Sequence, residues 1–211
     1  MLQKIRQTLS RYRQLPQAVL LMIAAEFCVQ GMNTAFFLLL NYYMVEEGYA
    51  DYEVARVISL RFMAVGLLAF PLGLFIKGRR LKPFFLFASL LVPLCSLVVI
   101  YAVDYQMNLL LNVATFVWGI GFMCMQITAL PFILLNAPRD LHSEGISLSY
   151  LAFGTMICLI GISYSLLNWL SPAFFNERNV LYGISVLALA GVYFSLRVRI
   201  PENRSERIPL R

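Results

Sequence analysis

Two charged residues lie deep inside long apolar segments, where a charge is expensive. Glu26 belongs to the apolar run that begins near residue 17, and Arg61 belongs to the next one. Ionisable residues at such positions usually face a bundle interior, a water-filled cavity or a partner of opposite charge. At about 1.5 Å per helical residue, both fall near the middle of a hydrocarbon core about 30 Å thick, so a Glu26–Arg61 ion pair is one hypothesis. A buried carboxyl is costly in its charged form, so Glu26 is also the candidate to carry a proton.

Other polar side chains recur at the helical period on the same and on later segments, as expected for helices that face a polar path. Tyr150 should lie near the level of Glu26, and Asn33 and Thr115 near that of Arg61. The alternative is that these stripes, rich in small residues, only pack helices together. The residues predicted to line the path are Glu26, Gln30, Asn33, Arg61, Asn112, Thr115, Gln126 and Tyr150.

The composition predicts a membrane protein. The 211 residues are 60% hydrophobic and 13% charged, whereas a soluble domain is about 45–50% apolar and about 25% charged. Because about 20 apolar residues cross a bilayer as a helix, we expect an all-α, integral membrane six-helix bundle over 17–198, between an N-terminal segment (1–16) and a tail (199–211). The six predicted helices are 17–44, 52–76, 82–103, 107–135, 143–168 and 179–198.

The basic residues predict the orientation of the bundle. With the N-terminus in the cytoplasm, most of the 17 Lys and Arg residues fall on the cytoplasmic side, in the first segment, the 77–82 hairpin and the tail. This agrees with the positive-inside rule. The first connector, "EEGYADYE", is acidic and suits the outer side. We therefore expect a multi-pass protein of the cell membrane with both termini cytoplasmic.

The pattern resembles the N-terminal half of a major facilitator superfamily transporter. In that family the first, second, fourth and fifth helices of each half line the path, the third and sixth are peripheral, and a basic hairpin follows the second helix. The stretch "GLFIKGRRLKP" resembles that hairpin but is two residues short and lacks its Asp. The residues that match its glycines and cations, and that the resemblance implies form a cytoplasmic gate, are Gly73, Lys77, Gly78, Arg79 and Arg80.

The resemblance implies a secondary active transporter that moves a small solute by alternating access, with ion coupling. Arg61 in the path would favour an anionic or zwitterionic substrate. Because the family pairs two such halves, the expected partners are the lipid bilayer, a small-molecule substrate, and either a missing C-terminal half or a homodimer partner. The alternative function is a six-helix membrane scaffold or subunit without transport activity.

Other chemistry finds little support in the sequence. His142, beside Asp140 and Glu144, could suggest a metal or pH-sensing site, but a solvated helix start capped by Ser143 is the simpler interpretation. The four cysteines are far apart in apolar runs and lack metal-ligand spacing. No nucleophile has a base partner, and the cations flank the apolar runs rather than forming a solvated face. We expect no enzymatic activity, metal, cofactor or nucleic-acid partner.

Overall fold

A computed structural model of the chain describes residues 10–171 and 174–199. The regular structure of these residues is entirely helical, and six spans are long and apolar enough to cross a membrane. This confirms the prediction of an all-α, six-helix membrane bundle, with bounds within a few residues of those expected. The spans are α2 (Gln17–Glu46), α3 (Asp51–Ile76), α4 (Lys82–Asp104), α5 (Asn108–Asn136), α6 (His142–Leu170), and α7 (Glu177–Ala188) followed by α8 (Ala190–Arg197).

Two local details differ from the sequence-based expectation. The sixth span is interrupted at Leu189, whose N–H donates to the Val186 carbonyl at 3.1 Å, a tighter turn than the α-helical one. The fifth span begins at His142, after the short 3₁₀ helix Arg139–Leu141, and its N-cap residue Leu141 makes no side-chain capping bond. Ser143 is therefore not the cap: it lies inside α6, where its carbonyl accepts a bond from the Ser147 hydroxyl.

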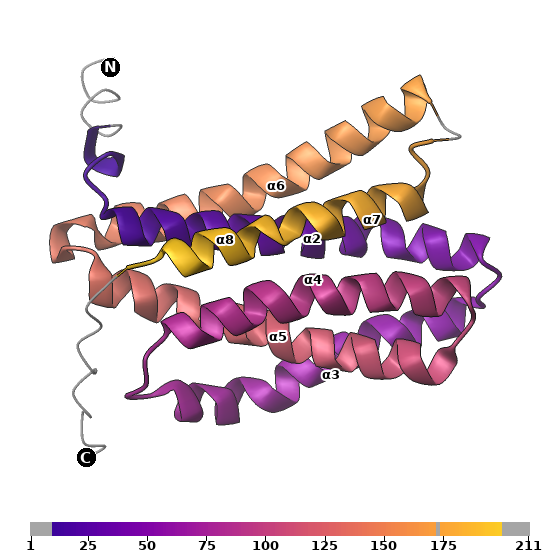
Figure 1. Cartoon of the computed structure of the whole chain (residues 1–211), viewed down its shortest axis with the longest axis horizontal. Coiled ribbons are helices and arrows are strands. Elements are labelled where there is room, and N and C mark those ends of the chain that lie inside the picture. Colours follow the sequence, from indigo (N-terminus) through magenta and orange to yellow (C-terminus); the bar gives the residue numbers. More distant parts are fainter. Residues whose placement is uncertain (1–9, 172–173, 200–211) are drawn as a thin grey trace.

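The helices form two layers (Figure 1). In one layer, contacts follow the order α6, α2, α5, α3, and in the second, α7–α8 packs on α2 while α4 packs on α5. Helix α2 is the most buried span, whereas α3 and α6, at the two ends of its layer, are the least buried. The first layer therefore has one face covered by α4 and α7–α8 and one face that these helices leave open.

The third and sixth spans are joined to each other by serine pairs. Helix α4 is among the more buried spans within the described chain. One stripe of α4 is exposed, but its opposite side holds two serines that bond to the sixth span: Ser89 with Ser195 at 2.8 Å, and Ser96 with Ser185 at 2.9 Å. Hydroxyl pairs of this kind join membrane helices, because the surroundings offer the hydroxyls no water.

A glycine sets the closest approach between α3 and α5. A Cβ atom placed on Gly119 would lie 2.5 Å from the carbonyl oxygen of Arg61 and 2.8 Å from the Cβ of Ala64. Neither atom is the end of a flexible side chain, so any larger residue at this position would push the helices apart. Small residues allow this kind of close packing between membrane helices.

A polar cluster joins three helices at the end of the bundle opposite the 77–82 hairpin. Asp104, at the end of α4, accepts hydrogen bonds from the Tyr43 hydroxyl of α2 and from the Arg178 guanidinium of α7, whose Nη2 lies 2.6 Å from Asp104 Oδ2. The Tyr182 hydroxyl approaches the same oxygen at 3.4 Å. Charge-assisted bonds are stronger than neutral ones, so Asp104 fixes the ends of α2, α4 and α7 relative to one another.

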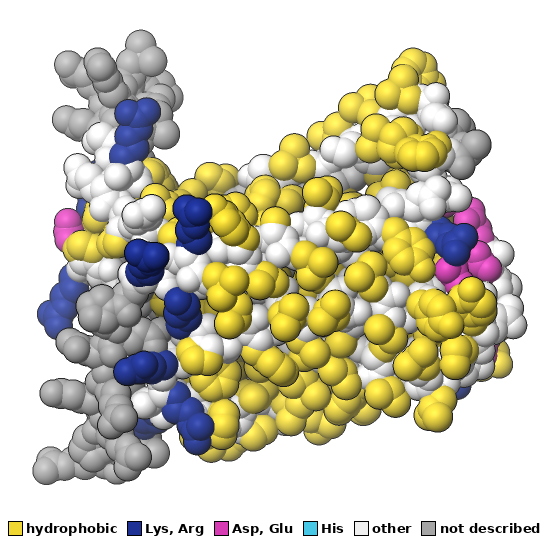
Figure 2. Space-filling view, in the orientation of Figure 1, with side chains coloured by type: hydrophobic (Ala, Val, Ile, Leu, Met, Phe, Trp, Pro, Cys, Tyr) yellow, Lys and Arg dark blue, Asp and Glu magenta, His cyan; other side chains and the backbone are white. Residues whose placement is uncertain are grey.

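Charge is segregated along the bundle (Figure 2). Lys and Arg side chains gather at the end where α2 begins and α8 ends, Asp and Glu side chains gather at the other end, and hydrophobic side chains cover the surface between them. The α3–α4 connector lies at the basic end, where Lys82 Nζ also donates to the Leu196 carbonyl at 3.2 Å. This apolar surface between polar ends is that of a multi-pass membrane protein.

Replacing Gly119 by Val should destabilise the bundle by about 1–3 kcal/mol, because overpacking of this size moves backbone or strains side chains. The measurement is the free energy of unfolding in detergent, followed by circular dichroism. Gly154→Val is the matched control, since a Cβ on Gly154 of α6 meets no atom within 4 Å. An equal loss in both variants would contradict the close approach at Gly119.

Asp104→Asn should lower the unfolding free energy by about 1.5–3 kcal/mol, the range for hydrogen bonds to charged groups. The amide cannot accept from Tyr43 and Arg178 as strongly as the carboxylate does. Asp140→Asn, at an exposed position, is the control and should change little. If the two variants unfold alike, Asp104 does not join the three helices.

Candidate functional site

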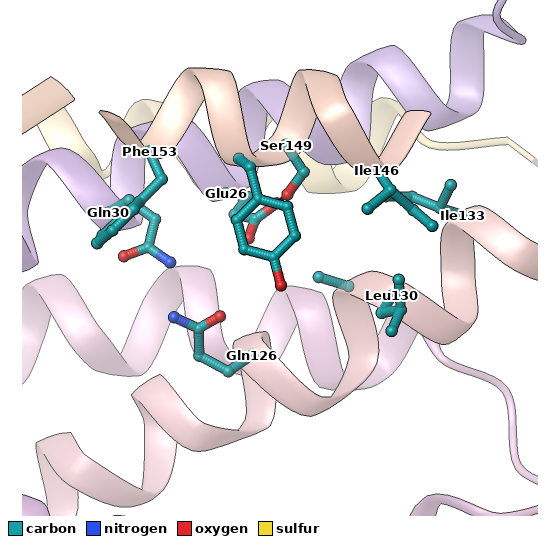
Figure 3. Close-up of a pocket in the computed structure, with 10 residues that line it drawn as sticks. Glu26, Gln30, Gln126, Leu130, Ile133, Ile146, Ser149 and Phe153 are labelled. Atoms are coloured by element: carbon teal, nitrogen blue, oxygen red, sulfur yellow. Dashed lines mark hydrogen bonds between the residues drawn. The ribbon is translucent and has the colours of Figure 1, made fainter. Parts of the chain in front are cut away.

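A pocket of about 160 Å³ lies between α2, α5 and α6 and brings polar groups together inside the apolar part of the bundle. Glu26 is 6% exposed, and its Oε2 accepts a hydrogen bond from the Ser149 hydroxyl of α6 at 2.7 Å. Figure 3 shows Glu26 and Gln30 on one side of the pocket and Gln126 rising from α5 on the other. The pocket is lined by Glu26, Gln30, Gln126, Ala129, Leu130, Ile133, Ile146, Ser149, Tyr150 and Phe153.

Helical periodicity places these side chains. Glu26 and Gln30 are four residues apart on α2 and so lie on one face. On α5 the lining residues begin at Gln126 and follow at spacings of three, four and seven, and on α6 they begin at Ile146 and follow the same spacings. One face of each of the three helices therefore borders the same space. In the sequence, each of these faces has the pattern of an ordinary amphipathic helix.

The polar groups of the pocket come from all three helices. Among the described residues of the lining, Glu26 is the one that carries a charge in its ionised form. Gln30, 3% exposed, lies one turn along α2 from Glu26, and its Oε1 is buried without a partner. An unpaired buried acceptor costs about 1–3 kcal/mol. The pocket thus combines a carboxyl group with an amide that has an unsatisfied acceptor.

The predicted Glu26–Arg61 ion pair is not formed. Arg61 is 7% exposed, and its guanidinium carbon lies 4.9 Å from the ring centre of Phe62 and 5.1 Å from that of Trp118. Among the described residues, the ion pairs are Arg11–Glu144, Arg56–Glu53 and Arg178–Asp104. The reason is the layer order: α5 lies between α2 and α3, and its Trp118 packs edge-on against Phe36 of α2 at 4.7 Å. Aromatic faces stabilise the Arg61 cation in place of a carboxylate.

The predicted path residues therefore divide into two groups. Glu26, Gln30, Gln126 and Tyr150 line the pocket, whereas Arg61, Asn33, Asn112 and Thr115 do not. The Thr115 hydroxyl bonds within its own helix, to the Leu111 carbonyl at 2.7 Å. The side-chain oxygens of Asn33 and Asn112 are buried without a hydrogen-bond partner.

The hairpin residues form an exposed basic turn. Gly78 has a φ of 74°, a left-handed conformation that favours glycine. The Arg79 guanidinium carbon lies 3.8 Å from the ring centre of Phe75, and Lys77 and Arg80 are exposed. A Cβ on Gly73 would meet no atom within 4 Å, so close packing within the described chain does not require glycine there.

The residues of the His142 cluster contact other parts of the chain rather than one another. His142 Nε2 lies 3.0 Å from the Ala137 carbonyl oxygen, and Glu144 pairs with Arg11 at 2.8 Å. In the part of the chain that the structure describes, no group of three His, Cys, Asp or Glu residues is placed to hold a metal ion. These contacts fasten the segment before α2 to the start of α6. Lys4 and Arg6, and the tail beyond Arg199, lie outside the described residues.

Sequence reasoning missed two polar contacts. Ser149 is absent from the residues predicted to line the path, although a buried Glu26 needs a hydrogen-bond donor. Asp104 was overlooked because it ends an apolar segment, although a carboxylate with Arg178 on the same side of the membrane is a pairing that topology alone suggests.

Sequence comparisons gave no relative: no protein-family model matches the chain, and no curated protein matches it significantly. Function must therefore be argued from the geometry of this site.

If Glu26 and Arg61 do not interact, the effects of Glu26→Gln and Arg61→Met on the unfolding free energy should add to within about 0.5 kcal/mol. The measurement is a double-mutant cycle on the purified protein in detergent. An ion pair would instead give a coupling energy clearly above that value, and such a result would contradict the observed separation of the two residues.

Proposed function

We propose that this chain is a six-helix unit of the major facilitator type that moves a small solute across the cell membrane by alternating access. The observation that carries the proposal is the polar pocket around Glu26, which lies inside an otherwise apolar bundle and draws its walls from the first, fourth and fifth spans. Buried polar groups at this depth are expensive and are typical of substrate and ion pathways.

The layer order supports the same proposal. Helices α6, α2, α5 and α3 lie side by side, with α4 and α7–α8 behind them, and this matches the division into path-lining and peripheral helices that the resemblance implies. The open face of that layer would then meet a second six-helix unit, either the C-terminal half of a longer chain or a second copy. In this proposal the basic end of Figure 2 is cytoplasmic, in accord with the positive-inside rule.

The polar contacts suggest how the unit would move. Asp104 binds α2, α4 and α7 together, whereas α6 contacts mainly α2 and only lightly α5. Helix α6 would rearrange against the partner unit while the rest, including α3 with its close packing on α5, moves as one body. Glu26 would then carry the coupling proton or contact the substrate directly, since it is the charged group in the pocket.

A cysteine in the pocket should react with a membrane-impermeant thiol reagent from either side of the membrane, because alternating access exposes one site to both solutions in turn. The test introduces Gln126→Cys after the four native cysteines are replaced. Labelling is measured in intact cells and in inverted membrane vesicles.

Met125→Cys is the matched control, since Met125 is the neighbouring residue on α5 and is fully buried. It should stay unlabelled in both preparations. Protection of residue 126 from both sides, as a packed scaffold would give, or labelling from one side only, would overturn the transport proposal.

A further inference from the structure

The pocket around Glu26 has an acidic side chain and, among the described residues, no Lys or Arg in its lining. The cation expected in the path, Arg61, instead lies against the rings of Phe62 and Trp118. Arg61 therefore gives this pocket no basis for an anionic substrate. We propose that the pocket binds a small organic ammonium ion, a protonated primary amine with a short apolar body; this rests on the proposed transport function and names its substrate class.

The hydrogen-bond inventory of the pocket favours an ammonium group over other cations. An ammonium is a compact charge with three donors and no acceptor. The pocket presents the Glu26 carboxyl as an acceptor, and the buried Gln30 on the same face of α2 has an Oε1 without a partner. The Ser149 hydroxyl donates to Glu26, which holds the carboxyl group in place. One ammonium could satisfy the carboxylate and the orphan oxygen together.

The rest of the lining suits a short apolar body. Part of the wall is apolar and is formed by Ala129, Ile133 and Ile146. Two aromatic rings, those of Tyr150 and Phe153, complete it, and the faces of aromatic rings attract cations. A cavity of about 150 Å³ accommodates a molecule of roughly benzene size, so a pocket of about 160 Å³ suits an amine of a few carbon atoms. Tyr150 is 72% exposed, which places it at the border between the pocket and the open face of the layer.

The test uses the full chain in phosphatidylcholine nanodiscs and three probes of one shape: butylammonium, butyrate and 1-butanol. Isothermal titration should show binding of butylammonium alone. Glu26→Gln should weaken that binding at least tenfold, and Gln30→Leu by roughly two- to tenfold, the range for one hydrogen bond. Equal binding of butyrate or butanol, or unchanged binding in Glu26→Gln, would overturn the proposal.

A variant that is expected to bind more tightly keeps the test valid even if Glu26→Gln fails to fold. Gln126→Glu adds a second carboxylate across the pocket from Glu26 and should tighten butylammonium binding several-fold. Asn41→Asp, which adds the same charge on α2 outside this pocket, should leave it unchanged. If both variants tighten binding equally, the effect is general electrostatics, and the proposed site is wrong. If Na⁺ at equal concentration displaces butylammonium, the pocket is a metal-cation site, and the ammonium proposal is also wrong.

The outcome is separable from that of the transport proposal. Two-sided labelling of residue 126 without butylammonium binding would leave the transport function standing and remove the substrate class. Butylammonium binding with one-sided labelling would keep the amine site and remove alternating access.

Discussion

The absence of water from the hydrocarbon core is the constraint on which this structure depends. A polar group inside an apolar bundle must find its partner within the protein, since none is available from solvent. The serine pairs between α4 and the sixth span and the Ser149–Glu26 bond satisfy that requirement. Gln30, which lines the pocket, is an exception with a buried unpaired oxygen, and Asn33 and Asn112 are exceptions outside it.

Helix α2 lies at the centre of the bundle, because the other helices contact either α2 itself or a helix that packs on it. It contacts α6 at one edge, α7–α8 on its covered face and α5 at the other edge. A helix surrounded in this way is apolar on most of its circumference, and its few polar residues therefore mark the directions in which it meets a cavity or a bonded partner. Glu26 and Gln30 face the pocket, whereas Tyr43 reaches Asp104.

The two buried charges are stabilised by different means, and the difference gives the site its character. Arg61 is a delocalised, weakly hydrated cation that aromatic rings can accommodate without a carboxylate. The Glu26 carboxyl is a localised group that needs a donor, which Ser149 supplies. Because α5 separates the two residues, no Lys or Arg among the described residues of the pocket lining compensates a charge on Glu26.

The sequence by itself determined the number of spans, their approximate bounds, the segregation of basic residues and the presence of Glu26 and Arg61 within apolar spans, because these follow from local hydropathy. It also indicated that Gln30, Gln126 and Tyr150 lie on polar helix faces. Which faces meet was decided only in three dimensions. The order α6, α2, α5, α3 brought Ser149 to Glu26, kept Arg61 away from it and paired four serines across the bundle, since neighbours in space are fixed by packing between helices rather than by the period within one.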